Sequence, residues 1–130
     1  MNKTKLLRSD IQAIIGEILE DGGFEAALYY DHAPSQQHKA KYVIFSVEEV
    51  TKLDERIAYE LEINCNDYGE DTEACENMAD AIAAALDHSV HISESIAFYI
   101  YANRRNNVRA DDEKIVRRRL TFDLYLYEWG

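Results

Sequence analysis

The stretch DTEACENMADAIAAALD, residues 71–87, decides the fold because it is the clearest helix in the chain and separates two groups of strands. Asp71 or Thr72 can cap its N-terminus, and Glu73 and Glu76 face the positive end of the helix dipole. Its apolar residues recur at steps of three and four, so they form one stripe on a helix. The members of this stripe are Cys75, Met78, Ala79, Ile82, Ala85 and Leu86. The stripe is rich in alanine, which predicts close packing on a sheet.

The length and the net charge predict one acidic domain covering residues 1–130, since a chain of 130 residues can bury a core without cross-links. The net charge of −11 argues against non-specific nucleic-acid binding, which depends on Lys and Arg. Residues 48–80 contain twelve acidic and two basic side chains, whereas residues 104–119 contain seven basic and three acidic ones. Patches of opposite charge suit pairing with another copy or a neighbour, although a merely solvated surface is the alternative.

Two cysteines, Cys65 and Cys75, are predicted to face the core, one from a strand and one from the helix stripe. The N-terminus lacks the pattern of a signal peptide, and no apolar run approaches the ~20 residues that a membrane span needs. We therefore expect free thiols in a protein made and used in a reducing cytoplasm, with no membrane partner.

A first helix is predicted over residues 4–20, although Ser9 and Gln12 have the spacing of a capping box and allow a later start. Its apolar face consists of Leu7, Ile11, Ile14, Ile15 and Ile18. The Asp-Gly-Gly sequence at residues 21–23 is expected to end this helix, because glycine adopts the left-handed closing conformation most easily.

Three strands are predicted before the central helix, over residues 24–30, 42–47 and 57–65, because these segments are apolar, β-branched or alternating. Residues 31–39 are expected to form a polar loop, and residues 48–55 a charged connection. Two more strands follow the helix, over residues 96–101 and 116–127, with a polar hairpin tip at residues 106–112. The last strand should be central or paired along its length. The predicted class is α+β, in the order α-β-β-β-α-β-β, with an antiparallel sheet, or a mixed one as the alternative, packed on two helices.

The outward positions of the last two strands contain four tyrosines: Tyr99, Tyr101, Tyr125 and Tyr127. Grouped exposed tyrosines are typical of a surface that meets another subunit, and packing against the first helix is the alternative. Arg118 falls on the apolar face of the last strand, so we expect it to reach solvent or to find a carboxylate.

Catalytic, cofactor and metal sites are not indicated. His88 and His91 have H-x-x-H spacing, but a third ligand is missing, and ordinary surface histidines explain them better. The acidic run at residues 67–73 lacks the ligand pattern of an EF-hand loop, so helix capping explains it better. The known nucleophile, phosphate-loop and metalloprotease motifs are absent from the sequence, so we expect no enzymatic activity.

Basic side chains are concentrated at Arg104-Arg105 and at Arg117-Arg118-Arg119. Nucleic acid is one hypothesis for the partner of these arginines. Asp111, Asp112 and Glu113 lie beside them and would repel phosphate, so an acidic neighbouring subunit is favoured. The predicted interface therefore joins the acidic and basic regions through Glu60, Glu62, Arg104, Arg105, Arg109, Arg117 and Arg119, together with the four tyrosines.

The chain resembles the tail-terminator, or tail-completion, proteins of tailed bacteriophages and prophages. The residues that carry the resemblance are the strand ERIAYELEINCNDYGED (55–71), the helix TEACENMADAIAAALD (72–87) and the closing RRRLTFDLYLYE (117–128). Within the helix, the family's Ala-Asp-x-Ile-x-x-Ala-Leu core is matched by Ala79, Asp80, Ile82, Ala85 and Leu86. The loop at residues 31–39 and the tip at residues 106–112 match nothing specific in the family.

The resemblance implies a small structural subunit that closes into a homo-hexameric ring, ends growth of the tail tube and meets the head-tail connector. It implies no cofactor and no catalysis, with DNA passing through the ring without specific binding. The expected location is the virion tail, and the host bacterial cytoplasm during assembly. The alternatives are another phage head-tail joining or minor capsid protein, and an acidic regulatory module that binds a basic host protein or imitates DNA.

Overall fold

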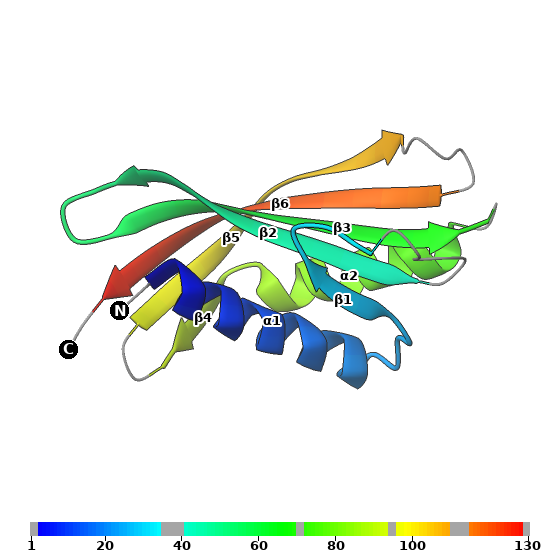
Figure 1. Cartoon of the computed structure of the whole chain (residues 1–130), viewed down its shortest axis with the longest axis horizontal. Helices are drawn as coiled ribbons and strands as arrows, with labels where there is room; N and C mark the ends of the chain where they lie inside the picture. The colour runs from blue at the N-terminus through cyan, green and yellow to red at the C-terminus, as the bar shows by residue number, and fades with distance from the viewer. Residues whose placement is uncertain (1–2, 35–40, 70–71, 94–95, 110–114, 129–130) are drawn as a thin grey trace.

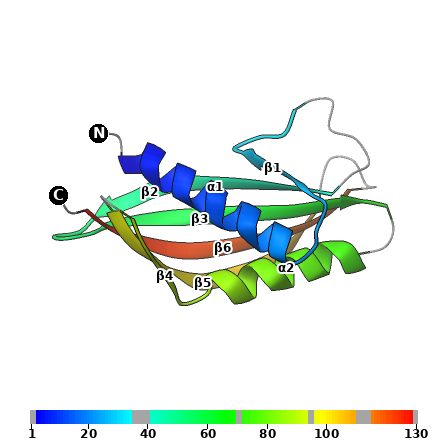
Figure 2. The same ribbon diagram turned by 90° about the horizontal axis from the view of Figure 1, so that it is seen from below.

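The computed structural model describes residues 3–34, 41–69, 72–93, 96–109 and 115–128. Within these residues, six strands form one sheet and both helices cover the same face of it (Figures 1 and 2). The elements are α1 (Lys3–Asp21), β1 (Ala27–Tyr30), β2 (Tyr42–Lys52), β3 (Ile57–Tyr68), α2 (Glu73–Leu86), β4 (Ser89–Ile92), β5 (Ile96–Arg109) and β6 (Ile115–Glu128). The α+β class and the packing on two helices are confirmed.

The strand order in the sheet is β1-β2-β3-β6-β5-β4, and all neighbours are antiparallel except the parallel pair β1 and β2. The sheet is therefore mixed, which the sequence left open. β6 pairs with β3 on one side and with β5 on the other over most of its length. The expectation of a central last strand is confirmed.

The core lies between the helices and one face of the sheet. α1 contributes Leu7, Ile11, Ile15 and Leu19, all buried, and begins at Lys3 rather than at Ser9. It ends before two glycines: the N–H of Gly23 donates to Glu20 O, and Gly23 has a φ of 71°, as the Asp-Gly-Gly sequence predicted. Alternate residues of the four long strands complete the core, including Phe45, Leu61, Phe98, Phe122 and Leu124.

α2 covers the other part of the same sheet face. Cys75, Met78, Ala79, Ile82 and Leu86 are buried as predicted, but Ala85 is exposed, so its place on the stripe was wrong. Thr72 is the N-cap residue, yet its side chain makes no capping hydrogen bond. The capping prediction therefore fails for Thr72, and Asp71 lies outside the described residues.

Three strand predictions need correction. Residues 89–92, expected as a loop, form the short strand β4, which pairs with residues 97–100 of β5. Residues 48–52, expected as a connection, continue β2 as far as Lys52, and β5 continues through the expected tip to Arg109. In each case the neighbouring strand supplies hydrogen-bond partners, so pairing overrides the polar composition. The rest of the tip, residues 110–112, lies outside the described residues.

The two cysteines and Arg118 behave as the sequence indicated. Cys65 and Cys75 are buried and not bonded to each other, and the thiol of Cys75 donates to Cys65 O at 3.0 Å. Arg118, with its side chain 13% exposed, pairs with the carboxylate of Glu76 on α2. This ion pair fixes the first turn of α2 to β6.

Candidate assembly surface

The sheet face opposite the helices (Figures 1 and 2) is here called the outer face. Its side chains come from the alternate strand positions that do not enter the core. Cross-strand register divides it into three parts along the strands. A tyrosine cluster occupies one end, a row of carboxylates crosses the middle, and arginines paired with asparagines occupy the other end.

The tyrosine cluster consists of Tyr99, Tyr101, Tyr125 and Tyr127. The ring of Tyr99 lies 5.1 to 5.7 Å from the other three, and its hydroxyl lies 3.3 Å from that of Tyr127. Arg56 lies over the ring of Tyr125 at 4.6 Å and donates to the Tyr99 hydroxyl at 2.7 Å. All four tyrosines are on the outer face, so the alternative of packing against the first helix is wrong.

Hydrogen bonds at the tyrosine hydroxyls shift the pKa values of Tyr99, Tyr127 and Arg56. Hydrogen bonding with Tyr127 raises the pKa of Tyr99, while the hydrogen bonds with Tyr99 and then Arg56 lower the pKa of Tyr127. Hydrogen bonding to Tyr127 in turn raises the pKa of Arg56. Arg56 thus contacts two members of the cluster, with its charge over the Tyr125 ring and a hydrogen bond to the Tyr99 hydroxyl.

Carboxylates meet side by side in the middle of the outer face. Glu48 on β2 is opposite Glu60 on β3, and Glu60 is opposite Asp123 on β6. Side chains at directly opposed positions lie roughly 5 Å apart, so these three charges repel one another. The amide of Asn103 donates to both oxygens of Asp123 at 3.2 and 3.3 Å. Glu48 and Glu60 have no comparable contact within the described chain, so this row carries unbalanced negative charge.

The arginines at the far end are held by their own chain. Arg117 donates to Asn66 Oδ1 at 2.6 Å, while Arg119 donates to Asn64 Oδ1 at 3.1 Å and forms an ion pair with Glu62 at 3.1 Å. Asn66 is fully buried and donates to two backbone carbonyls. These arginines therefore close the outer face over a buried asparagine ladder rather than projecting into solvent.

The predicted interface residues thus differ in availability. Arg105 lies on the helix side of the sheet, where it pairs with Glu76 at 2.8 Å and Asp80 at 2.6 Å of its own chain. Three acidic side chains of residues 48–80, Glu62, Glu76 and Asp80, are thus paired with arginines of residues 104–119 inside one copy. Arg104 is exposed on the outer face and makes no hydrogen bond or ion pair with any described residue. The side chain of Arg109 lies outside the described part.

The side chains of His88 and His91 lie in different surroundings. His88 is exposed beside Asp87 at 3.1 Å, while His91 is half-buried against Phe98 and contacts the Ser89 hydroxyl at 2.9 Å. Burial lowers the pKa of His91, and the N–H of Ala102 lowers the pKa of Asp87. Across the described ranges, no group of three or more His, Cys, Asp and Glu side chains could hold a metal ion. No helix in those ranges is long and apolar enough to cross a membrane.

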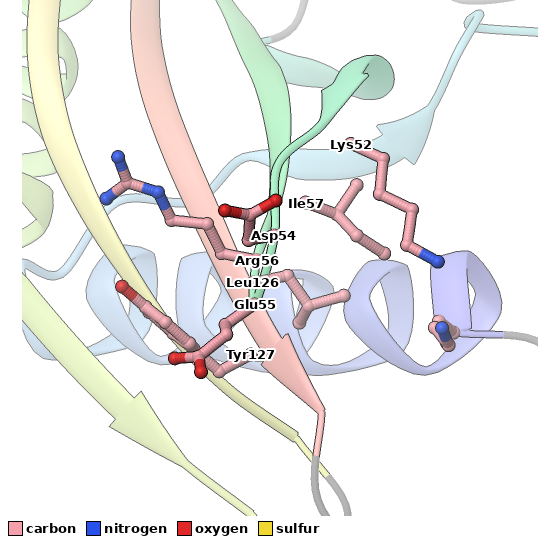
Figure 3. Close-up of a pocket in the computed structure, with 8 residues that line it drawn as sticks. Lys52, Asp54, Glu55, Arg56, Ile57, Leu126 and Tyr127 are labelled. Carbon is pink, nitrogen blue, oxygen red and sulfur yellow. The ribbon is translucent and has the colours of Figure 1, made fainter.

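A hollow of about 540 Å³ lies at the turn of the β2–β3 hairpin, between residues 52 and 57 (Figure 3). Its lining combines acidic, basic and apolar side chains, including Lys52, Asp54, Arg56 and Tyr127. The charged groups of the lining lie on exposed or half-exposed positions, where water screens them. The hollow is an open depression beside the tyrosine cluster, and its residues show no pairing of a nucleophile with a base.

Sequence reasoning missed one feature, which is that each edge of the sheet is covered over only half its length. β1 pairs with residues 42–45 of β2, which leaves the free half of β2 (residues 46–52) without a second neighbour among the described strands. β4 pairs with residues 97–100 of β5, and the free half of β5 (residues 103–109) is likewise open. The sequence carries little signal for these edges, because residues 48–52 and 103–109 are mostly polar and only Val50, Thr51 and Val108 among them are β-branched.

Comparison with known proteins finds a likeness among solved structures but not among sequences. No protein-family model and no curated protein matches the sequence. Among solved structures, this chain is similar to a chain in a structure titled as the virion of a native gene transfer agent particle. The TM-score is 0.63 and the identity 15%, with 90% of this chain and 86% of the other covered. The likeness therefore spans nearly the whole of both chains, and at this identity it shows a shared fold.

Proposed function

We propose that this chain is a structural subunit of a phage or phage-like particle, in the role of a tail terminator. Six copies form a ring that ends growth of the tail tube and joins the tail to the head-tail connector. The observation that carries the proposal is the shared fold with a chain of a gene transfer agent virion, over 90% of this chain. The resemblance in residues 55–87 and 117–128 supports the tail-terminator role. The subunit works by shape and charge, without catalysis or cofactor, in the virion and in the bacterial cytoplasm during assembly.

The first test is the mass of the purified chain at increasing concentration, by light scattering, alone and with tail tubes from the same genome. A ring would have six times the 15.0 kDa chain mass. Electron microscopy should show tubes closed at one end and no longer growing when tube protein is added. A chain that stays monomeric and leaves tube growth unchanged would refute the proposal. Genes for a connector and a tube protein beside this gene are the expected neighbourhood.

A second role with the same fold is another head-tail joining or minor capsid protein, because the neighbour's title names a particle. Binding to the connector with no effect on tube length would favour that role. An acidic regulator is disfavoured, because Glu62, Glu76 and Asp80 are paired with arginines of their own chain. A stable monomer that binds a basic host protein would favour the regulator.

A further inference from the structure

Two half-open strand edges lie at opposite sides of the sheet. In Figure 1 the β2–β3 hairpin extends from one end of the molecule, and the far ends of β5 and β6 extend from the other. Residues 48–52 of β2 and residues 103–107 of β5 are all exposed, whichever sheet face their side chains point to. Each segment is therefore held by one neighbouring strand alone within the described chain and stands clear of the core.

The backbone of the free half of β5 offers hydrogen bonds outward. The backbone N–H of Ala102 donates to Asp87 at 2.8 Å, so the backbone groups of Ala102 point away from β6. The pairing then shifts by one residue at Asn103, since Ala102 is opposite Phe122 and Arg104 is opposite Thr121. Before this bulge the even-numbered residues direct their backbone groups away from β6, and after it the odd-numbered residues do. The N–H and C=O groups that point away from β6 are those of Arg105, Asn107 and Arg109.

The free half of β2 is the counterpart. Phe45 O accepts from the N–H of Asp31 on the β1 side, so odd-numbered residues of β2 point to that edge. The register shift between Glu49 and Thr51 changes this alternation, so that even-numbered residues point to the same edge after it. Val47, Glu49 and Lys52 therefore direct their backbone groups outward. An open edge of this kind is a template for pairing with another chain.

Charge selects which edges can meet. Two free β2 halves would bring Glu48 and Glu49 against their copies, and two free β5 halves would bring Arg104 against its copy, so both self-pairings are repelled. A β2 edge against a β5 edge instead places Arg104, which has no partner among the described residues, near the unbalanced row that Glu48 begins. Unlike edges are thus attracted, while like edges are repelled.

We propose that the free half of β5 in one copy pairs with the free half of β2 in the next copy, continuing the sheet from subunit to subunit. β2 and β5 run in opposite directions in the sheet, so the added strand is antiparallel. Two different patches on each copy make a head-to-tail contact, which closes into a ring when the rotation allows. The inference rests on the proposed function, because it names the contact through which the ring forms.

The test is Asn107→Pro, with Asn107→Ala as the matched control. Proline removes the N–H that points away from β6, so the β5–β6 pairing and the unfolding temperature are retained. We expect Asn107→Pro to associate at least about tenfold more weakly than Asn107→Ala in sedimentation velocity. Equal association of the two variants would overturn the edge pairing and leave the ring standing. A wild-type chain that is monomeric at every concentration and with tail tubes would overturn both proposals.

Discussion

Replacing Glu76 by alanine should destabilise the fold more than replacing the arginine it pairs with. Glu76 accepts from Arg118, whose side chain is 13% exposed, and from Arg105, which is 34% exposed. Glu76→Ala leaves Arg118 charged against apolar side chains with no carboxylate. A fully buried unpaired charge costs about 3–5 kcal/mol, and the partial exposure of this pair, 13% for Arg118 and 38% for Glu76, reduces the cost to about 2 kcal/mol.

Arg118→Met is the contrasting change, because methionine has a similar length, carries no charge and suits the apolar sheet face. We expect it to change the free energy of unfolding by less than about 1 kcal/mol. The double variant should be more stable than Glu76→Ala alone, since the unpaired charge is gone. Urea unfolding followed by circular dichroism gives all three values. A larger loss for Arg118→Met than for Glu76→Ala would refute this reasoning.

Four further predictions follow from buried and half-buried groups. Burial raises the pKa of Cys65 to about 12 and of Cys75 to about 11, so neither thiol should react with Ellman's reagent at pH 8 until urea is added. The pKa of His91 is lowered below 6.5, so the unfolded chain binds more protons there, and stability falls as pH drops below about 6.5; His91→Gln should flatten this slope in unfolding curves. Thr121 Oγ1 is buried without a hydrogen-bond partner in the described chain, so Thr121→Val should raise the free energy of unfolding by about 1 kcal/mol. Asn66→Ala should lower the same quantity by about 2 kcal/mol, because it removes three hydrogen bonds at a fully buried site.

The helices and the long strands could be predicted from sequence because their side-chain periods are strong. Leu7, Ile11 and Ile15 follow the helical period, and Ile57, Tyr59 and Leu61 alternate along β3. The same patterns placed Arg118 on the inner face, where Glu76 meets it. Spacing thus assigns most faces in these segments, with Ala85 of α2 as the exception, since it is exposed.

Strand ends and edges could not be predicted, because tertiary pairing determines them. Residues 48–52 read as a loop by polarity, yet β3 holds them as strand. β4 has four residues, too few for a period of two to be distinguished from chance. The parallel direction of β1 also has no local signal, since it depends on how the chain returns after residue 34.

The candidate interface could be predicted only in part. The tyrosines were assigned to an outward surface from alternation alone, and the structure places them there. The partners of Arg105 and Arg119 depend on which strands and helices meet, so sequence reasoning assigned these arginines to a neighbouring subunit. Both have partners in their own chain, which makes Arg104 the better probe of contact between copies.

Exchange of charge between the two free edges tests head-to-tail assembly most directly. In Arg104→Glu both edges carry a carboxylate on the outer face, at positions 48 and 104, and in Glu48→Arg both carry an arginine at these positions. Sedimentation velocity should show each variant alone as a monomer, and an equimolar mixture at the mass of the wild-type assembly, because unlike edges again meet. Wild-type assembly by either variant alone, or a mixture that stops at two-copy complexes, would contradict the account.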